Sequence, residues 1–327
     1  MSEARIKQEI VTVFGGSGFV GRYVVQALAR RGYRVRAAVR RPDLAGHLQT
    51  HGVVGQIHAV QANVRNRDSI ARAVAGSHAV VNLVGILFEA GKQTFDRVQA
   101  EAPGWIAAAA KEAGAHRVLQ MSAIGADPDS PAEYGRSKAD GEAAALDAFK
   151  DTVVVRPSII FGAEDGFFNR FAEMARFLPA LPLIGGGHTR FQPVFVGDVA
   201  EAVARAVDGN ATPGTIYELG GPEIRSFKEL LDLMFEETRR PRLLLPLPVP
   251  VAKFQARLMQ LLPNPMLTVD QVRLLEHDNV VSDAAIKDGR TLDGLGIAET
   301  AMASVLPSYL WRFRPDGQFE REGADAT

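Results

Sequence analysis

Apolar and polar positions follow two different periods along the chain. In the first half, short runs rich in valine, isoleucine and alanine alternate with segments whose apolar residues recur every three or four positions. Apolar runs are typical of strands buried on both faces, and helical segments between them are typical of parallel crossovers. The expected strands cover residues 10–14, 34–39, 56–60, 78–85, 117–122 and 152–157. The pattern therefore predicts an α/β fold with a doubly wound, mostly parallel sheet.

Helices are expected in the stretches between these strands. The helix over residues 95–113 contains Pro103, which should kink or restart it because proline cannot donate the helical hydrogen bond. Ser130 and Glu133 have the spacing of a capping box, with Pro131 at the first helical position. Further helices are expected over residues 68–74 and 199–207.

The first expected strand runs directly into a glycine-rich loop, residues 15–21, of sequence GGSGFVG. In this context Gly15 permits the turn, Gly18 lets the backbone approach a pyrophosphate, and Gly21 lets the next helix pack closely against the sheet. The free N–H groups at the helix N-terminus favour an anion. The loop predicts a Rossmann domain that binds a dinucleotide. The other loop residues expected at the dinucleotide are Ser17, Phe19 and Val20.

Two arginines follow the second expected strand. NAD-binding folds usually place an acidic residue about 20 residues after the glycines, where it bonds the ribose 2′-hydroxyl. Here that position holds Arg40, followed by Arg41, and the first carboxylate is Asp43. A guanidinium suits a 2′-phosphate, so NADP(H) is favoured, and NADPH in particular. The alternative is a solvated basic turn.

The second half of the chain differs in composition from residue 161 onward. Prolines and three consecutive glycines at 185–187 indicate loops, and two capping boxes, Ser226 to Glu229 and Thr268 to Gln271, predict helices. We expect a nucleotide-binding domain over residues 1–160, to which 188–212 returns. A smaller, mainly helical domain should cover 161–315, followed by a flexible tail over 316–327.

Composition and charge exclude several classes of function. The 327 residues are 46% apolar and carry a net charge of −1, which gives no electrostatic case for a nucleic-acid partner. The absence of cysteine excludes disulfides and thiolate sites, and His47, His51 and His58 lack metal-ligand spacing, so no metal site is expected. Apolar stretches end before the ~20 residues needed to span a bilayer. We expect neither a transmembrane helix nor a targeting peptide.

Three polar residues indicate proton and hydride chemistry. Ser122 ends the fifth expected strand, and Tyr134 and Lys138 lie one turn apart on one helix face. An ammonium lowers the pKa of a nearby tyrosine hydroxyl, which can then transfer a proton while hydride moves to or from the cofactor. Ser122 would polarise the same carbonyl, and Lys138 would also hold the nicotinamide ribose. This set predicts a catalytic site that is either active or vestigial.

In their order, these motifs resemble those of the short-chain dehydrogenase/reductase superfamily over about the first 200 residues. The matching motifs are Gly15-x-x-Gly18-x-x-Gly21, Asn82-Leu83-Val84-Gly85, Ser122, Tyr134-x-x-x-Lys138 and Arg156-Pro157. Many members have Asp where Asn63 stands beside the adenine, and an asparagine carbonyl can still bond the ring amine. Besides the loop residues, the resemblance implies cofactor contacts at Arg40, Arg41, Asn63, Val64, Leu83, Val84, Gly85, Ser122, Tyr134, Lys138, Pro157, Ile159 and Ile160.

More narrowly, the chain resembles the atypical branch that forms the nucleotide-binding accessory subunit of respiratory NADH:quinone oxidoreductase (complex I). The supporting segments are residues 134–142, 158–165, 191–200 and 278–282. The resemblance implies an NADPH held tightly for assembly or stability, without known turnover. It also implies a place among the peripheral-arm subunits, near the membrane.

The segment 241–262 favours docking. It combines a proline-rich apolar stretch with an amphipathic one, in which the apolar side chains share a face bordered by Lys253 and Arg257. The members of this face are Val251, Phe254, Leu258, Leu261 and Leu262. Such a face suits a membrane surface or a partner subunit. A helix of the domain core is the alternative.

Three functions remain open from the sequence. The favoured one is an NADP(H)-binding accessory subunit of complex I, peripheral on the cytoplasmic side of a bacterial inner membrane. The alternative is a free-standing NADP(H)-dependent oxidoreductase or epimerase acting on a small carbonyl or sugar-nucleotide substrate. A redox-sensing regulator is less favoured, because nothing in the sequence identifies a DNA-binding partner.

Overall fold

The computed structural model describes residues 6–260, 262, 265 and 267–317. The chain divides into two compact units. The first comprises the residues up to 157 together with 196–219 and 281–298, and the second comprises 158–195, 220–280 and the residues from 299 onward. The domain boundaries expected from the sequence stay predictions. Most of the expected tail, residues 318–327, lies outside the described residues.

The first unit is built on a seven-stranded sheet with the strand order β11-β6-β5-β4-β1-β2-β3, in which every pairing is parallel. This confirms the predicted fold class. The strands are β1 (Ile10–Phe14), β2 (Arg34–Val39), β3 (Ile57–Gln61), β4 (Ala79–Asn82), β5 (Arg117–Met121), β6 (Val153–Pro157) and β11 (Ile216–Leu219). β4 is shorter than expected, so Leu83, Val84 and Gly85 lie in the loop after it.

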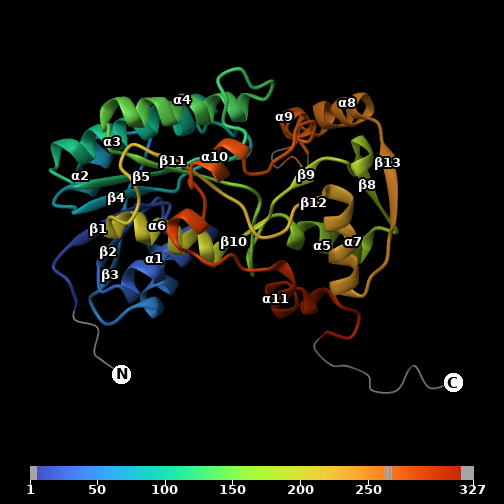
Figure 1. Ribbon diagram of the computed structural model, residues 1–327, viewed down its shortest axis with the longest axis horizontal. Coiled ribbons are helices and arrows are strands. Elements are labelled where there is room, and N and C mark those ends of the chain that lie inside the picture. Colours follow the sequence, from blue (N-terminus) through green and yellow to red (C-terminus); the bar gives the residue numbers. More distant parts are fainter. Residues whose placement is uncertain (1–5, 261, 263–264, 266, 318–327) are drawn as a thin grey trace. The chain divides into compact units, whose positions relative to one another are not determined.

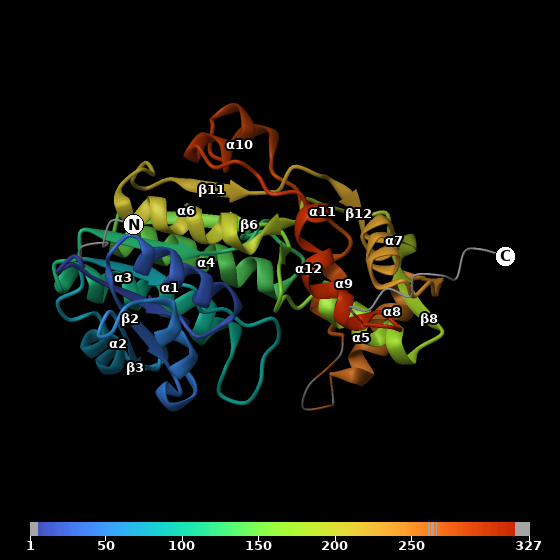
Figure 2. The same ribbon diagram turned by 90° about the horizontal axis from the view of Figure 1, so that it is seen from below.

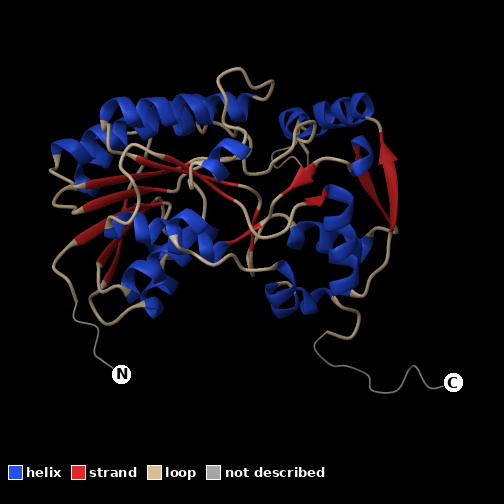
Figure 3. Ribbon diagram, in the orientation of Figure 1, coloured by secondary structure: helices blue, strands red, loops and turns tan. Residues whose placement is uncertain are grey.

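Helices cover both faces of this sheet (Figures 1 and 3). α1 (Phe19–Arg30) and α6 (Val196–Asp208) pack against each other on one face. α2 (Arg67–Val74), α3 (Ala102–Glu112) and α4 (Glu133–Ala148) cover the other face. The short α10 (Asp283–Lys287) lies beside β11, the edge strand (Figure 2). Because the carboxyl ends of parallel strands share one edge, the loops after β1, β2, β4 and β5 gather there.

The helix expected over 95–113 is interrupted as predicted. A π-helical segment, Asp96–Glu101, precedes α3, and Pro103 lies in the first turn of α3. The backbone is helical on both sides of this junction, and the π turn accommodates the proline, which cannot donate a helical hydrogen bond. The wider π turn marks the point where the helix restarts.

The capping box predicted at Ser130 is wrong. α4 begins at Glu133, and its extended N-cap residue, Ala132, receives no side-chain cap. Ser130 instead belongs to a preceding turn, in which its N–H donates to the carbonyl of Asp127 and its Oγ accepts from the N–H of Ala132. Pro131 therefore precedes the helix.

The second unit combines three two-stranded pairings with helices. The pairings are β7 (Ile160–Phe161) with β10 (Val194–Phe195), β8 (Ala180–Ile184) with β13 (Leu243–Leu247), and β9 (Arg190–Phe191) with β12 (Arg225–Ser226). The helices are α5 (Phe168–Phe177), α7 (Phe227–Thr238), α8 (Val249–Met259), α9 (Val269–Leu274), α11 (Met302–Val305) and α12 (Pro307–Leu310). The two capping boxes predicted here, at Ser226 before α7 and Thr268 before α9, are confirmed.

Candidate functional site

The glycine loop between β1 and α1 closes on itself. A Cβ on Gly21 would lie 2.2 Å from the carbonyl oxygen of Gly15, and Gly15 has a φ of +78°. A Cβ on Gly16 would lie 3.1 Å from the Cβ of Ala37 in β2. The close approach at Gly21 is therefore to the loop backbone. The sequence predicts a close approach to the sheet, and this prediction is wrong. Gly18 faces solvent, and the loop leaves its backbone accessible to a ligand.

The N-terminus of α1 is free for an anion. Gly18 occupies the N-cap, no side chain caps the helix, and its first turn carries no acidic residue. The first N–H groups of the helix thus have no intrahelical partner and lie beside the glycine loop. Ser17 lies in the loop, while Phe19 and Val20 form the start of the helix. This arrangement fits the diphosphate of a dinucleotide.

The two arginines after β2 differ in their surroundings. Arg41 donates to Asp43 through both Nε and Nη2, the shortest distance being 2.6 Å. Arg40 is exposed and makes no hydrogen bond or ion pair within the described part of the chain. Asp43 offsets the charge of Arg41, whereas the charge of Arg40 is not offset by a partner among the described residues.

The loops after β3 and β4 lie at the carboxyl edge of the sheet, where the glycine loop also lies. The Oδ1 of Asn63 accepts from the N–H of Arg65 at 3.1 Å, which leaves one lone pair for another donor. Val64 and Val84 both pack against the apolar cluster that contains Phe14. A Cβ on Gly15 would lie 3.4 Å from the Leu83 carbonyl carbon and from Val84 Cγ2. The structure therefore brings these loops to the glycine loop.

Ser122, Tyr134 and Lys138 gather where β5 ends. Ser122 is 4% exposed, and its Oγ is buried without a hydrogen-bond partner among the described residues. The Nζ of Lys138 lies 3.5 Å from the carbonyl oxygen of Met121 and 5.7 Å from the ring centroid of Tyr134. A buried hydroxyl without a partner is rare in proteins, and at an active site it marks a place for a ligand.

The protonation of this set differs from our expectation. Burial raises the pKa of Tyr134 to about 12, whereas a nearby ammonium was expected to lower it. Burial also lowers the pKa of Lys138 to about 8, against the opposing charge of Glu142. The prediction for Tyr134 is wrong because its surroundings remove water from the hydroxyl, which disfavours the charged phenolate. At neutral pH Tyr134 is therefore a hydrogen-bond donor, and Lys138 is close to losing its proton.

Three buried residues support the set and were missed from the sequence. The ring of Phe95 meets the ring of Tyr134 edge-on, with the centroids 6.1 Å apart. Gln99, in the π-helical segment, accepts from the N–H of Ile86 at 2.9 Å and donates to the Oγ of Ser137 at 3.0 Å. The third is Glu142 in α4, which is 4% exposed. For Gln99 and Glu142, the signal available in the sequence is a polar side chain on the buried helix face, which does not reveal its partner.

The remaining predicted residues fall in different places. Pro157 ends β6 in the first unit, and its carbonyl accepts from the N–H of Ile124 at 3.0 Å. Ile159 and Ile160 belong to the second unit, where Ile160 begins β7. Their contact with a cofactor stays a prediction.

The residues of the first unit fit a nicotinamide dinucleotide. The glycine loop and the uncapped N-terminus of α1 offer a place for the diphosphate, and the Ser122 hydroxyl offers an unused donor and acceptor. Arg40 supplies a free positive charge at the end of β2. Together these features provide for the diphosphate, the nicotinamide end and the adenosine end of such a ligand.

Comparison with known proteins also indicates a nicotinamide-dinucleotide site. Residues 11–220 match the model of the NAD dependent epimerase/dehydratase family. The subunit named "NADH dehydrogenase [ubiquinone] 1 alpha subcomplex subunit 9, mitochondrial" is 37% identical in Arabidopsis thaliana, over 85% of this chain and 72% of that protein. Its counterpart in Rattus norvegicus is 37% identical over 93% of this chain and 80% of that protein.

Solved structures share the fold at low identity. An NADPH-dependent quinone oxidoreductase of Escherichia coli in complex with NADPH superposes with a TM-score of 0.70 at 18% identity, over 92% of this chain and 98% of that one. A dTDP-glucose 4,6-dehydratase of Bacillus anthracis in complex with NAD gives a TM-score of 0.70 at 15% identity, over 92% and 95%. The predicted resemblance is thus confirmed. The chain is a nicotinamide-dinucleotide-binding member of the NAD dependent epimerase/dehydratase family, in the group that contains the alpha subcomplex subunit 9 proteins.

Proposed function

We propose that this chain is an NADP(H)-binding accessory subunit of respiratory NADH:quinone oxidoreductase, complex I. The observation that carries the proposal is the likeness to subunit 9 proteins at 37% identity over most of both chains, in a chain whose glycine loop is intact. The cofactor serves as a structural ligand of the peripheral arm, and the chain has no turnover of its own.

NADPH is the proposed ligand because Arg40 and Arg41 differ in whether a carboxylate pairs with them. Arg40 has no partner in the described chain, whereas Arg41 is held by Asp43. A 2′-phosphate would pair with the free guanidinium, and a 2′-hydroxyl would leave that charge unused. Bound NADPH stabilises the folded subunit by mass action, by roughly 4 kcal/mol when its concentration is a thousand times the dissociation constant. Occupancy of the site would thereby control how much subunit is available for assembly.

The docking site is proposed on α8 in the second unit. Its apolar side chains Val251, Phe254 and Leu258 are exposed, while Ala252 and Ala256 face the core of that unit. Leu262 is also exposed, and Leu261 lies outside the described residues. An exposed apolar helix face with basic residues at its border suits a partner subunit of the peripheral arm, at the membrane surface on the cytoplasmic side of a bacterial inner membrane. Over the described ranges, no helix has the length and apolar character needed to cross a bilayer.

The proposal is tested by blocking cofactor loading in cells. Gly18→Asp places a carboxylate where the diphosphate would lie, so the variant should lose NADPH and lower the amount of assembled complex I in membranes. Native gels and NADH oxidation by the membranes measure the effect. Full assembly with a nucleotide-free variant would contradict the structural role of the cofactor.

A second candidate function has one observation in its favour. The buried Ser122 hydroxyl is unused, and Tyr134 and Lys138 lie beside it, as a carbonyl reductase would require. If Tyr134→Phe abolishes an NADPH-linked reduction by the purified chain, the enzyme interpretation is correct. If respiratory NADH oxidation survives the same change and no reduction is found, the accessory-subunit interpretation stands.

A further inference from the structure

The helix that carries Tyr134 and Lys138 carries a third polar residue one turn further on. Glu142 follows Lys138 by four positions in α4, so the two side chains lie on the same helix face. Glu142 is 4% exposed. A carboxylate buried to this degree requires a partner, since removal from water strongly disfavours its charged form.

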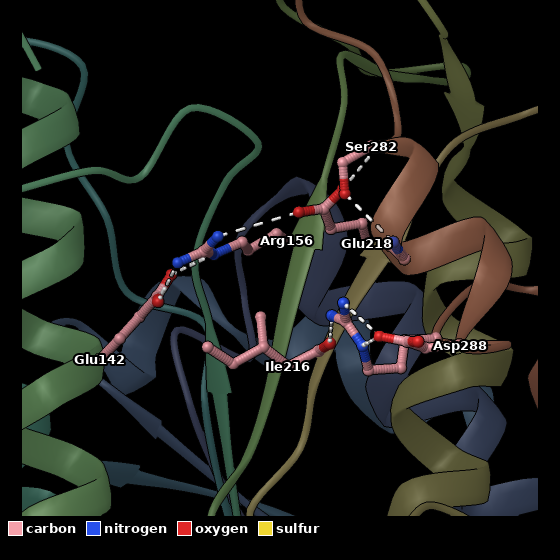
Figure 4. Close-up of polar contacts among 8 residues, drawn as sticks. Glu142, Arg156, Ile216, Glu218, Ser282 and Asp288 are labelled. Atoms are coloured by element: carbon pink, nitrogen blue, oxygen red, sulfur yellow. Dashed lines mark hydrogen bonds and ion pairs between the residues drawn. The ribbon is translucent and has the colours of Figure 1, made fainter.

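Arg156 in β6 is that partner. Its Nε and Nη2 donate to the two carboxylate oxygens of Glu142 at 2.8 and 2.6 Å, and Figure 4 shows the two side chains pointing toward one another. This two-bond geometry is the strongest form of an arginine–carboxylate pair. It fixes both the charge and the direction of the Glu142 carboxylate.

Arg156 is held from its other side as well. Its Nη1 lies 3.8 Å from Oε1 of Glu218 in β11, and Oε2 of Glu218 accepts from the N–H of Ser282 at 2.8 Å (Figure 4). Ser282 is the N-cap residue of α10. The charges therefore alternate from Lys138 through Glu142 and Arg156 to Glu218, and the guanidinium has little freedom to leave Glu142.

The other neighbours of Lys138 contribute no charge at neutral pH. Its Nζ faces the Met121 carbonyl at the end of β5 and the Tyr134 ring, and Gly85 approaches from the loop after β4. Gln99, near Gly85, is uncharged. The charge of Asp127 favours the charged form of Arg156 and raises its pKa. Within the described chain, Glu142 is thus the charged group that favours the ammonium form of Lys138 against burial.

We propose that Glu142, fixed by Arg156 one helical turn from Lys138, is a positioning residue that keeps the Lys138 ammonium charged at the ribose position of the dinucleotide site. The inference rests on the proposed NADP(H) binding, because it assigns the ribose hydroxyls to Lys138. Without the Glu142 charge, burial acts unopposed and the lysine gives up its proton at lower pH.

The pH dependence of NADPH binding tests this inference. In calorimetric titrations from pH 6.5 to 9.5, wild-type affinity should fall as the pH rises through about 8, where Lys138 loses its charge. Glu142→Gln should move this fall to lower pH, because the charge that opposes the effect of burial on Lys138 is removed. Glu142→Asp, which keeps the charge, should restore most of the wild-type profile.

A matched control removes a different arginine–glutamate pair in the same unit. Glu201→Gln breaks the 2.5 Å pair with Arg31, on helices α6 and α1. This variant should keep the wild-type pH midpoint. An unchanged midpoint in Glu142→Gln, or an equal displacement in Glu201→Gln, would overturn the inference while leaving NADP(H) binding intact.

A second measurement needs no nucleotide. A folded-state lysine pKa of about 8, below the ordinary 10.5, means that the free protein gains stability as the pH rises from about 8 to 10.5. In Glu142→Gln, this gain in the free energy of unfolding should begin at lower pH. If wild type binds no nucleotide, the proposed function fails, and the onset of this gain still decides the role of Glu142.

Discussion

The ammonium of Lys138 lies 3.5 Å from the carbonyl oxygen of Met121, the residue that ends β5. This contact places the lysine beside the next residue, Ser122, whose buried hydroxyl has no partner in the described chain. The helix and the strand end thus present two polar groups at the edge where the glycine loop also lies. The predictions below test what each part of this edge contributes.

Gly21→Ala should weaken NADPH binding. The new Cβ would lie 2.2 Å from the Gly15 carbonyl oxygen, so the loop must open. Overpacking of this kind costs about 1–3 kcal/mol, and if the nucleotide-bound state bears this cost, the dissociation constant for NADPH should rise roughly 5- to 150-fold. Gly46→Ala is the matched control, because a Cβ there meets nothing within 4 Å. If calorimetry gives both variants the same affinity for NADPH, the glycine loop is not the binding site of the diphosphate.

Arg40→Ala should weaken NADPH binding and leave NADH binding unchanged. A hydrogen bond to a charged group contributes about 1.5–3 kcal/mol, so the affinity for NADPH should fall roughly 10- to 100-fold. Arg41→Ala should have a smaller effect, since Asp43 already holds that side chain. If the affinities for NADPH and NADH fall by the same factor, Arg40 does not bind the 2′-phosphate.

Lys138→Met should stabilise the nucleotide-free protein. The buried ammonium has its pKa lowered from 10.5 to about 8, which at pH 7 costs the folded state on the order of 3 kcal/mol. Removing the lysine should raise the free energy of unfolding in urea at pH 7. It should also remove the gain in stability between pH 8 and 10.5. If the variant is less stable than wild type and still gains stability between pH 8 and 10.5, the ammonium is not buried.

Phe254→Asp with Leu258→Asp should release the subunit from complex I without unfolding it. Both side chains are exposed, 65% and 54%, so the change in the free energy of unfolding should stay within about 0.5 kcal/mol. Leu44→Asp is the control, since Leu44 is 66% exposed on the first unit. Association is read from native gels of solubilised membranes. Equal retention of both variants would exclude α8 as the docking site.

Much of the first unit could be predicted from the sequence because its signals are local. Short apolar runs separated by helical spacing specify a parallel sheet, and the spacing of Gly15, Gly18 and Gly21 specifies the loop that follows β1. The Ser130 capping box failed for a local reason too. The same four-residue spacing occurs when the serine ends a preceding turn, here the turn from Asp127.

The supporting contacts of the site could not be predicted, because they join segments distant in the chain. Glu142 is identified only by its partner Arg156 on another element, and Gln99 by the Ile86 N–H and the Ser137 hydroxyl. The pKa of Tyr134 likewise depends on packing around its ring, including Phe95, which spacing within α4 does not reveal.

Purification of the native chain from cells, with identification of both its companion proteins and its bound nucleotide by mass spectrometry, tests the central claim most directly. We predict that the chain is recovered with complex I subunits and carries NADP(H) in nearly stoichiometric amount. Recovery of the chain alone, or with NAD(H) or no nucleotide in its place, would contradict the account.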